Sequence, residues 1–216
     1  RTSYSNAMIK KMKNFISIVD DAVQDSKLLD TFYKKSLEKE GLESFLSLRD
    51  LGLEANKLKK RLINELWING DNPFYKKDKC LFFEIWSNFY HDSCTHQSVK
   101  GLPYHLDKDE IFYNHTGEIK SPVYASLIYL GPKQQISGGD LYINTKGISH
   151  YLDYEQNGPK TINLNSPEWV KIEFKYNRFI IFDARLPHLV SPVITSPSGS
   201  PRSALAINVW DKEIAG

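Results

Sequence analysis

The period of the apolar residues changes along the chain. In the first third, apolar residues recur every three or four positions, which is the period of an amphipathic helix. One stripe runs from Met12 to Val23 through Phe15, Ile16 and Val19, and a second joins Leu58, Leu62 and Leu66, with Trp67 beside it. The second stripe is followed by Asn69-Gly70, and a glycine at this place often ends a helix. We therefore expect residues 8–80 to form a helical support for the rest of the chain; a helical module that binds a partner is the alternative.

From Cys80 onward, short runs rich in β-branched and aromatic residues replace the helical period. Turn signals such as Gly131-Pro132 and Ser137-Gly138-Gly139 separate these runs. Many short strands without alternating helices indicate a β-sandwich or barrel. We predict a mainly β fold with N-terminal helices, in which residues 81–216 form one structural unit. The predicted strands are Leu81–Tyr90, Val123–Leu130, Asp140–Asn144, Trp169–Tyr176, Phe179–Phe182, His188–Ile194 and Ala204–Trp210.

Composition and charge narrow the class of protein. A length of 216 residues with 41% hydrophobic and 25% charged residues is typical of one soluble globular unit. The net charge of +2 predicts neither a nucleic-acid partner nor a membrane surface. Residues 1–7, which end in Ser5-Asn6-Ala7 before Met8, have the look of an expression-tag remnant and lack the apolar core of a secretory signal. With only Cys80 and Cys94, one disulfide is possible by count, but two reduced thiols in a cytoplasmic protein is the simpler interpretation.

The candidate chemistry begins at His105-Leu106-Asp107. Residues two apart on a strand face the same side, so this imidazole and this carboxylate can point at one ion. His188, at the start of another predicted strand, can supply a second imidazole. Two imidazoles and one carboxylate on one face of an octahedron leave three positions open, which is the arrangement of non-haem Fe(II) oxygenases. A His-x-Asp pattern alone is more often a surface polar pair.

Arg202 opens the last predicted strand, 14 residues after His188. If two adjacent antiparallel strands carry these residues, the guanidinium lies near the metal site and can clamp a carboxylate bidentately. An exposed arginine at a strand end is the alternative.

Several further motifs occur in one order together with these residues. The chain resembles the 2-oxoglutarate- and Fe(II)-dependent dioxygenases, and within them the prolyl-4-hydroxylase-like branch, over roughly residues 81–212. The motifs that carry the resemblance are His105-x-Asp107, Gly138-Gly139-Asp140-Leu141, Arg178-Phe179-Ile180-Ile181-Phe182-Asp183, Pro187-His188-x-Val190-x-Pro192, Arg202 and Trp210.

The resemblance implies a double-stranded β-helix, or cupin-like jelly roll, with His105, Asp107 and His188 as ligands of Fe(II). It implies that Arg202 and Tyr129 bind the distal carboxylate of 2-oxoglutarate, although Tyr129 can equally be a core aromatic residue. It also implies hydroxylation of a substrate with O2, giving succinate and CO2, and ascorbate is a candidate additional cofactor. A prolyl residue, a free amino acid and a small metabolite are all compatible substrates.

Two rival functions remain open: a metal-binding barrel that works without 2-oxoglutarate, and a non-catalytic barrel that binds a ligand or a protein partner. We expect substrate specificity to lie on the loops 91–104, 108–121 and 145–165. Trp86, Tyr90 and Tyr104 can line the pocket or pack in the core, and Arg185 is expected to form a salt bridge. The remaining histidines are expected to be ordinary surface or loop residues: His91, His96, His115 and His150.

Overall fold

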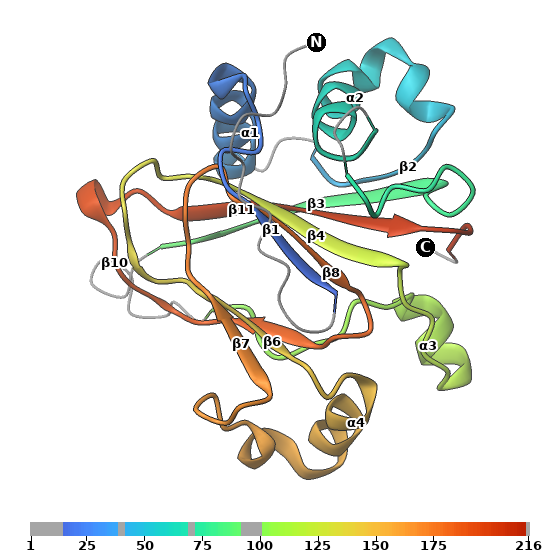
Figure 1. Ribbon diagram of the computed structural model, residues 1–216, viewed down its shortest axis with the longest axis vertical. Helices are drawn as coiled ribbons and strands as arrows, with labels where there is room; N and C mark the ends of the chain where they lie inside the picture. Colours follow the sequence, from blue (N-terminus) through green and yellow to red (C-terminus); the bar gives the residue numbers. More distant parts are fainter. Residues whose placement is uncertain (1–14, 39–41, 69–71, 92–100, 215–216) are drawn as a thin grey trace.

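Two antiparallel sheets face one another in the computed structural model, which describes residues 15–38, 42–68, 72–91 and 101–214 (Figure 1). The larger sheet has the strand order β1-β8-β4-β11-β3-β2, the smaller has the order β7-β6-β9, and β10 pairs with β5 at one side. These strands are β1 (Ile16–Val19), β2 (Ser44–Ser47), β3 (Phe82–Tyr90), β4 (Tyr124–Gly131), β5 (Ser137–Gly138), β6 (Leu141–Asn144), β7 (Trp169–Ile172), β8 (Phe179–Asp183), β9 (His188–Val190), β10 (Val193–Thr195) and β11 (Arg202–Trp210).

The alternation of side chains along β11 explains how the large sheet is buried on both faces. Leu205, Ile207 and Val209 point to one face and join a core cluster with the helices. Ala204 points to the other face and joins the core between the sheets. Arg202, Ala206 and Asn208 also lie on that inner face and line a cavity. Because Ala204 and Ala206 have small side chains, the centre of the inner face keeps room for a bound molecule.

The N-terminal helices cover the outer face of the large sheet (Figure 1). They are α1 (Ser26–Glu38) and α2 (Lys57–Ile63), which continues as a π-helical segment, Asn64–Ile68. The predicted stripe of the second helix is confirmed, since Leu62 and Leu66 are buried and Trp67 packs edge-on against Phe83 and Phe179. Burial of each leucine-sized side chain contributes about 2 kcal/mol to stability, so these helices are an integral part of the sheet's core.

The helix predicted from Met12 to Val23 is wrong within its described part. Ile16–Val19 is a strand, β1, which pairs antiparallel with β8 at the edge of the large sheet, with Ile16 opposite Phe182. Phe15 and Asp21 have positive φ angles and bracket this strand, so no helix can run through it. A short apolar run is compatible with an edge strand as well as with a helix. Here the pairing with β8 determines that it forms a strand.

Residues 15–47 thus contribute two strands, β1 and β2, to the large sheet in addition to a helix. A boundary between a support region and the β domain at residue 80 stays a prediction.

Five of the seven predicted strands of the β region are confirmed to within two residues at each end. The strand predicted at Trp169–Tyr176 ends at Ile172, as β7. The run His188–Ile194 forms β9 and β10, which lie in different sheets. The expectation that no helices alternate with the strands was wrong, because α3 (Glu110–Thr116) and α4 (Ile148–Asn157) lie between them. None of the helices in the described ranges combines the length and the apolar composition needed to cross a membrane.

Candidate metal centre

Backbone pairing brings His105 and His188 together from segments far apart in the sequence. His105 lies just outside the small sheet and forms an isolated antiparallel bridge with His188, at the start of β9. Their imidazole ring centroids are 4.2 Å apart. Asp107 lies two residues after His105, as the strand-like spacing predicted, and its carboxylate faces both rings.

The three side chains can each offer one ligand atom to a common ion. The Nε2 atom of His105 lies 3.7 Å from Asp107 Oδ1, and the Nε2 atom of His188 lies 3.9 Å from Asp107 Oδ2. All three ligand atoms lie within 4.8 Å of one another. Facial ligands at about 2.1 Å from one ion lie about 3 Å apart, so the three side chains have to move together only slightly to bind it.

Backbone carbonyls fix which nitrogen of each imidazole faces the ion. Nδ1 of His105 donates to the Pro103 carbonyl at 2.8 Å, and Nδ1 of His188 donates to the Leu186 carbonyl at 3.2 Å. Because a carbonyl only accepts, each Nδ1 carries the proton and each Nε2 presents its lone pair. Burial, aided by the neighbouring His105, lowers the pKa of His188 to about 4. The neutral, metal-ready form of His188 is therefore the one present at neutral pH.

Arg202 is a buried arginine with an unused hydrogen-bond donor. It is 1% exposed, and its Nε donates to the Gly139 carbonyl at 3.2 Å. One terminal nitrogen has no hydrogen-bond partner within the described part of the chain. Leaving a charged donor unsatisfied in a buried position is costly, so this atom is suited to a buried anion.

Tyr129 presents a second unused polar atom beside this guanidinium. The Arg202 guanidinium carbon lies 4.8 Å from the centroid of the Tyr129 ring, and the buried Tyr129 hydroxyl likewise lacks a hydrogen-bond partner among the residues described. Burial raises the pKa of Tyr129, so its hydroxyl stays protonated and can donate. A carboxylate is the group that accepts from both donors at once.

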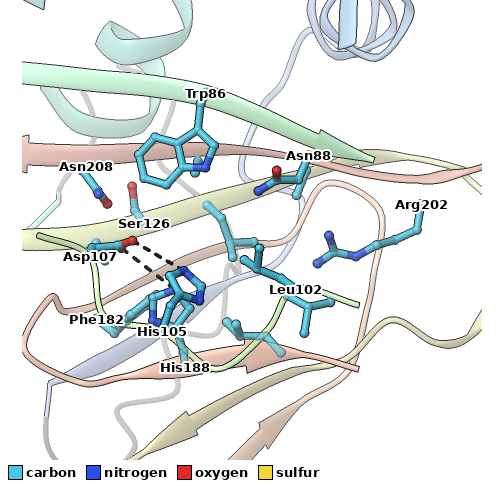
Figure 2. A pocket seen from close by; sticks show the side chains of 16 residues that line it. Trp86, Asn88, Leu102, His105, Asp107, Ser126, Phe182, His188, Arg202 and Asn208 are labelled. Atoms are coloured by element: carbon cyan, nitrogen blue, oxygen red, sulfur yellow. Dashed lines mark ion pairs between the residues drawn. The ribbon is translucent and has the colours of Figure 1, made fainter. Parts of the chain in front are cut away.

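The triad and Arg202 line the same cavity, which lies between the two sheets (Figure 2). Figure 2 shows Asp107 and the two histidines at one end and Arg202 at the other, with Trp86 and Asn88 along one wall. Apolar side chains also line the cavity: Leu102 lies between the two ends in Figure 2, and Phe182 packs edge-on against His188 at the triad end. The triad and the guanidinium therefore face one shared cavity from opposite ends.

The structure also places the other aromatic, basic and cysteine residues that the sequence brought to attention. The predicted salt bridge of Arg185 is confirmed, to Asp183. Trp86 lines the cavity, whereas Tyr104 packs in a separate aromatic cluster and bonds to His150. Tyr90 packs beside the Arg202 guanidinium, His115 is exposed, and His91 packs edge-on against Phe89. His96 and Cys94 lie outside the described residues, and Cys80 is buried as a free thiol.

The sequence interpretation missed three polar residues of the cavity: Asn88, Ser126 and Asn208. The sequence pattern of the last strand could have indicated Asn208. Side chains alternate along β11, so Arg202 and Asn208, six positions apart, lie on the same face of the strand.

No protein-family model matches the sequence, and no curated protein matches it. A prolyl-4-hydroxylase of Pseudomonas putida is similar in structure, with 15% identity, a TM-score of 0.50, and coverage of 92% of this chain and 86% of that chain. The chain shares its fold with this prolyl-4-hydroxylase.

The prolyl-4-hydroxylase fold confirms the predicted jelly roll and, at the level of the fold, the resemblance seen in the sequence motifs. Two further structures match with similar values. A prolyl hydroxylase of Trichoplax adhaerens, in complex with a peptide of hypoxia inducible factor, has 15% identity, a TM-score of 0.49, and coverage of 92% and 84% of the two chains. HygX of Streptomyces hygroscopicus, with nickel and 2-oxoglutarate bound, has 14% identity, a TM-score of 0.49, and coverage of 91% and 82%. At an identity of 15%, the similarity to the prolyl-4-hydroxylase establishes a shared fold. The function depends on the residues of the site.

Proposed function

We propose that this protein is an Fe(II)- and 2-oxoglutarate-dependent oxygenase that hydroxylates a substrate. The observation that carries the proposal is one cavity with a His-Asp-His triad at one end and an unsatisfied buried donor of Arg202 at the other, with the unsatisfied hydroxyl of Tyr129 on a ring beside that guanidinium. The distal carboxylate of 2-oxoglutarate matches these donors, and its keto acid end matches a metal with open positions.

His105, Asp107 and His188 would hold the metal. Their donor set is two neutral imidazoles and one carboxylate, which suits Fe(II) and leaves sites for other ligands. The carbonyls of Pro103 and Leu186 keep both rings in the metal-binding tautomer before any ion arrives. The chain thus holds its three ligands in place without a large rearrangement.

Arg202 and Tyr129 would bind the cosubstrate. The Gly139 carbonyl holds Arg202 Nε, so the free terminal nitrogen has a fixed direction. The rigid fork of an arginine and the hydroxyl of a fixed tyrosine select a planar carboxylate over a neutral group. Their burial also removes competing water, which strengthens the interaction.

The bound iron, 2-oxoglutarate and O2 together supply the oxidation of a C–H bond, while the chain orients the participants. Trp86 and Asn88 form one wall of the cavity, which a target group could contact. The apolar side chains of Leu102, Phe182 and Val190 limit the access of water between the two ends.

The test is a single turnover. Protein loaded with one equivalent of Fe(II) and isotopically labelled 2-oxoglutarate is mixed with O2, and labelled succinate is measured. We expect succinate to form in the wild type at up to about one equivalent per iron, because the triad would hold the metal and Arg202 would orient the cosubstrate in the same cavity. We expect none from Asp107→Ala or from metal-free protein.

Arg185→Ala is a matched control, because Arg185 is an exposed arginine that pairs with Asp183 outside the cavity. It should form succinate as the wild type does. Iron-loaded wild type that consumes no 2-oxoglutarate would favour a metal-binding barrel that works without this cosubstrate.

A further inference from the structure

Asn208 places an unsatisfied acceptor beside the triad. Its side chain is 2% exposed and lines the same cavity as Asp107. Its Oδ1 has no hydrogen-bond partner in the described ranges. Figure 2 shows Asn208 at the end of the cavity where Asp107 lies, far from Arg202. A buried carbonyl oxygen without a partner costs stability, so it is suited to a donor that arrives with a ligand.

Glu84 fixes the direction of this amide. Asn208 Nδ2 donates to Glu84 Oε2 at 3.4 Å, and Trp210 Nε1 donates to the same oxygen at 3.0 Å. Because the oxygen accepts both bonds, the NH2 group of Asn208 has to face Glu84. Its carbonyl oxygen therefore has to face away from Glu84, on the side of the amide that is left for a cavity ligand.

The surroundings of Asn208 are rich in acceptors and negative charge. Burial and the nearby carboxylates of Asp107 and Asp109 raise the pKa of Glu84, whereas the hydrogen bonds from Trp210 and Asn208 act in the opposite direction and favour its carboxylate form. A cation bound in the cavity favours that charged form further. Trp86 separates the cavity from a groove lined by Glu84, Glu43 and Glu213. Among the described residues lining the cavity and the groove, no lysine is present and Arg202 is the sole arginine. Arg202 lies at the opposite end of the cavity from Asn208.

We propose that the substrate carries a positively charged amino group, which donates a hydrogen bond to Asn208 Oδ1 in the field of Glu84. This inference rests on the proposed function and names the class of its substrate. A cationic nitrogen is a donor without a competing acceptor. It matches the Asp107 end of the cavity, where Asn208 Oδ1 has no partner among the described residues and the Ser126 hydroxyl already donates to the Ile207 carbonyl. The Trp86 ring on the adjoining wall adds a favourable surface for a cation. Asn208 is thus the substrate-binding residue, and Glu84 positions its amide and supplies the negative charge.

The probes are n-butylamine and butan-1-ol, which have similar shape and differ in charge. Protein is loaded with Mn(II) in place of iron and with 2-oxoglutarate, and the paramagnetic relaxation of each probe's methyl protons is measured by NMR. Zn(II)-loaded protein gives the diamagnetic baseline. We expect the amine to bind about tenfold more tightly than the alcohol, because a hydrogen bond that involves a charged group is worth more than a neutral one.

Glu84→Gln removes the charge but keeps an acceptor for Trp210, and we expect the preference for the amine to fall to near unity. Asn208→Leu should abolish amine binding. If Asn208→Leu folds poorly, the amine preference of Glu84→Gln still tests the proposal. Glu173→Gln removes one negative charge from an exposed residue and is the matched control, which should keep the preference.

Relaxation of the 2-oxoglutarate protons in the same samples distinguishes failure of the substrate inference from failure of the proposed function. If 2-oxoglutarate relaxes but the amine is not preferred, or if the preference survives Glu84→Gln, the inference about the substrate is overturned and the proposed function stands. If the amine is preferred but 2-oxoglutarate does not relax, the amino-group site stands and the cosubstrate assignment falls.

Discussion

His105 and His188 exchange both of their backbone hydrogen bonds. His105 N–H donates to the His188 carbonyl at 3.0 Å, and His188 N–H donates to the His105 carbonyl at 2.9 Å. The two residues are therefore held opposite one another by the same pairing that joins their segments. The distance between the imidazoles is set by the backbone, so the pair is preorganised for a metal ion before the ion binds.

Replacing His188 tests this preorganised pair. We expect His188→Ala to weaken Fe(II) binding by at least about 100-fold, because loss of a ligand costs more than loss of its outer partners. Isothermal titration of Fe(II) into anaerobic protein gives the affinity. His115→Ala removes an exposed histidine on α3 and should bind iron as the wild type does. Equal affinities in the two variants would contradict the assignment of His188 as a ligand.

Tyr129→Phe should raise stability and lower affinity for 2-oxoglutarate. In the ligand-free protein the buried hydroxyl is unsatisfied, so its removal should increase the free energy of unfolding by up to about 1 kcal/mol. Loss of the donor should weaken 2-oxoglutarate binding about tenfold. Denaturant unfolding and titration of the ligand measure the two effects. A variant with unchanged affinity would identify Tyr129 as a core aromatic residue alone.

Gly139→Ala should act on Arg202 through the backbone. Gly139 has φ +69°, and an added Cβ would lie 3.2 Å from Val193 Cγ2 and 3.4 Å from Arg202 Cδ. The left-handed conformation alone should cost about 1 kcal/mol. A shift of Gly139 away from Val193 would also move the carbonyl that holds Arg202 Nε, which should weaken 2-oxoglutarate binding.

Gly117→Ala is the matched control for this prediction. Gly117 has φ +73° in the left-handed conformation, but an added Cβ would have nothing within 4 Å. It should share the loss of stability and keep the affinity for 2-oxoglutarate. If both variants bind the ligand equally well, Gly139 does not position Arg202.

Asp20 should make the edge strand sensitive to acid. Arg178 holds this carboxylate through two bonds, Nε to Oδ1 at 2.6 Å and a terminal nitrogen to Oδ2 at 3.1 Å, and Lys175 adds a third at 2.9 Å. The bond from Arg178 lowers the pKa of Asp20 in the folded state. The stabilisation is therefore present above the unfolded-state pKa and is lost as the pH falls through the folded-state pKa.

We expect Asp20→Asn to reduce the free energy of unfolding at pH 7 by about 1 kcal/mol or less, since the pair is partly exposed. The difference from wild type should vanish in acid. Asp21→Asn changes the adjacent exposed aspartate and should have little effect at either pH. Urea unfolding at several pH values measures this, and a deficit that persists in acid would contradict the electrostatic explanation.

The sequence was most informative where local periodicity and pairing agree. The spacing of His105 and Asp107 predicted a shared face, and the structure brings both side chains to His188. The spacing between His188 and Arg202 was less informative, because it could not specify that Arg202 is buried and held by Gly139. That arrangement depends on the pairing of β11 with β4 and β3, which is not encoded in either motif.

The N-terminal strand shows where periodicity fails. Ile16 and Val19 fit one face of a helix, but positive φ angles at Phe15 and Asp21 and pairing with β8 make this segment a strand. The helix α3 could have been found, since Asp109 caps its N-terminus by accepting from Phe112 N–H, and Gly117 follows its end. The roles of Glu84 and Asn208 required the structure, because they depend on side-chain contacts between neighbouring strands.

The most direct test of the central claim is isothermal titration of 2-oxoglutarate into anaerobic protein, with and without Fe(II), for wild type, Arg202→Ala and the matched control Arg185→Ala. We expect iron-dependent binding in the wild type and in Arg185→Ala. Binding to Arg202→Ala should be weaker by about 100-fold, the cost of removing a buried charged partner. Absence of binding to iron-loaded wild type, or equal binding to all three proteins, would contradict the assignment of this cavity to 2-oxoglutarate.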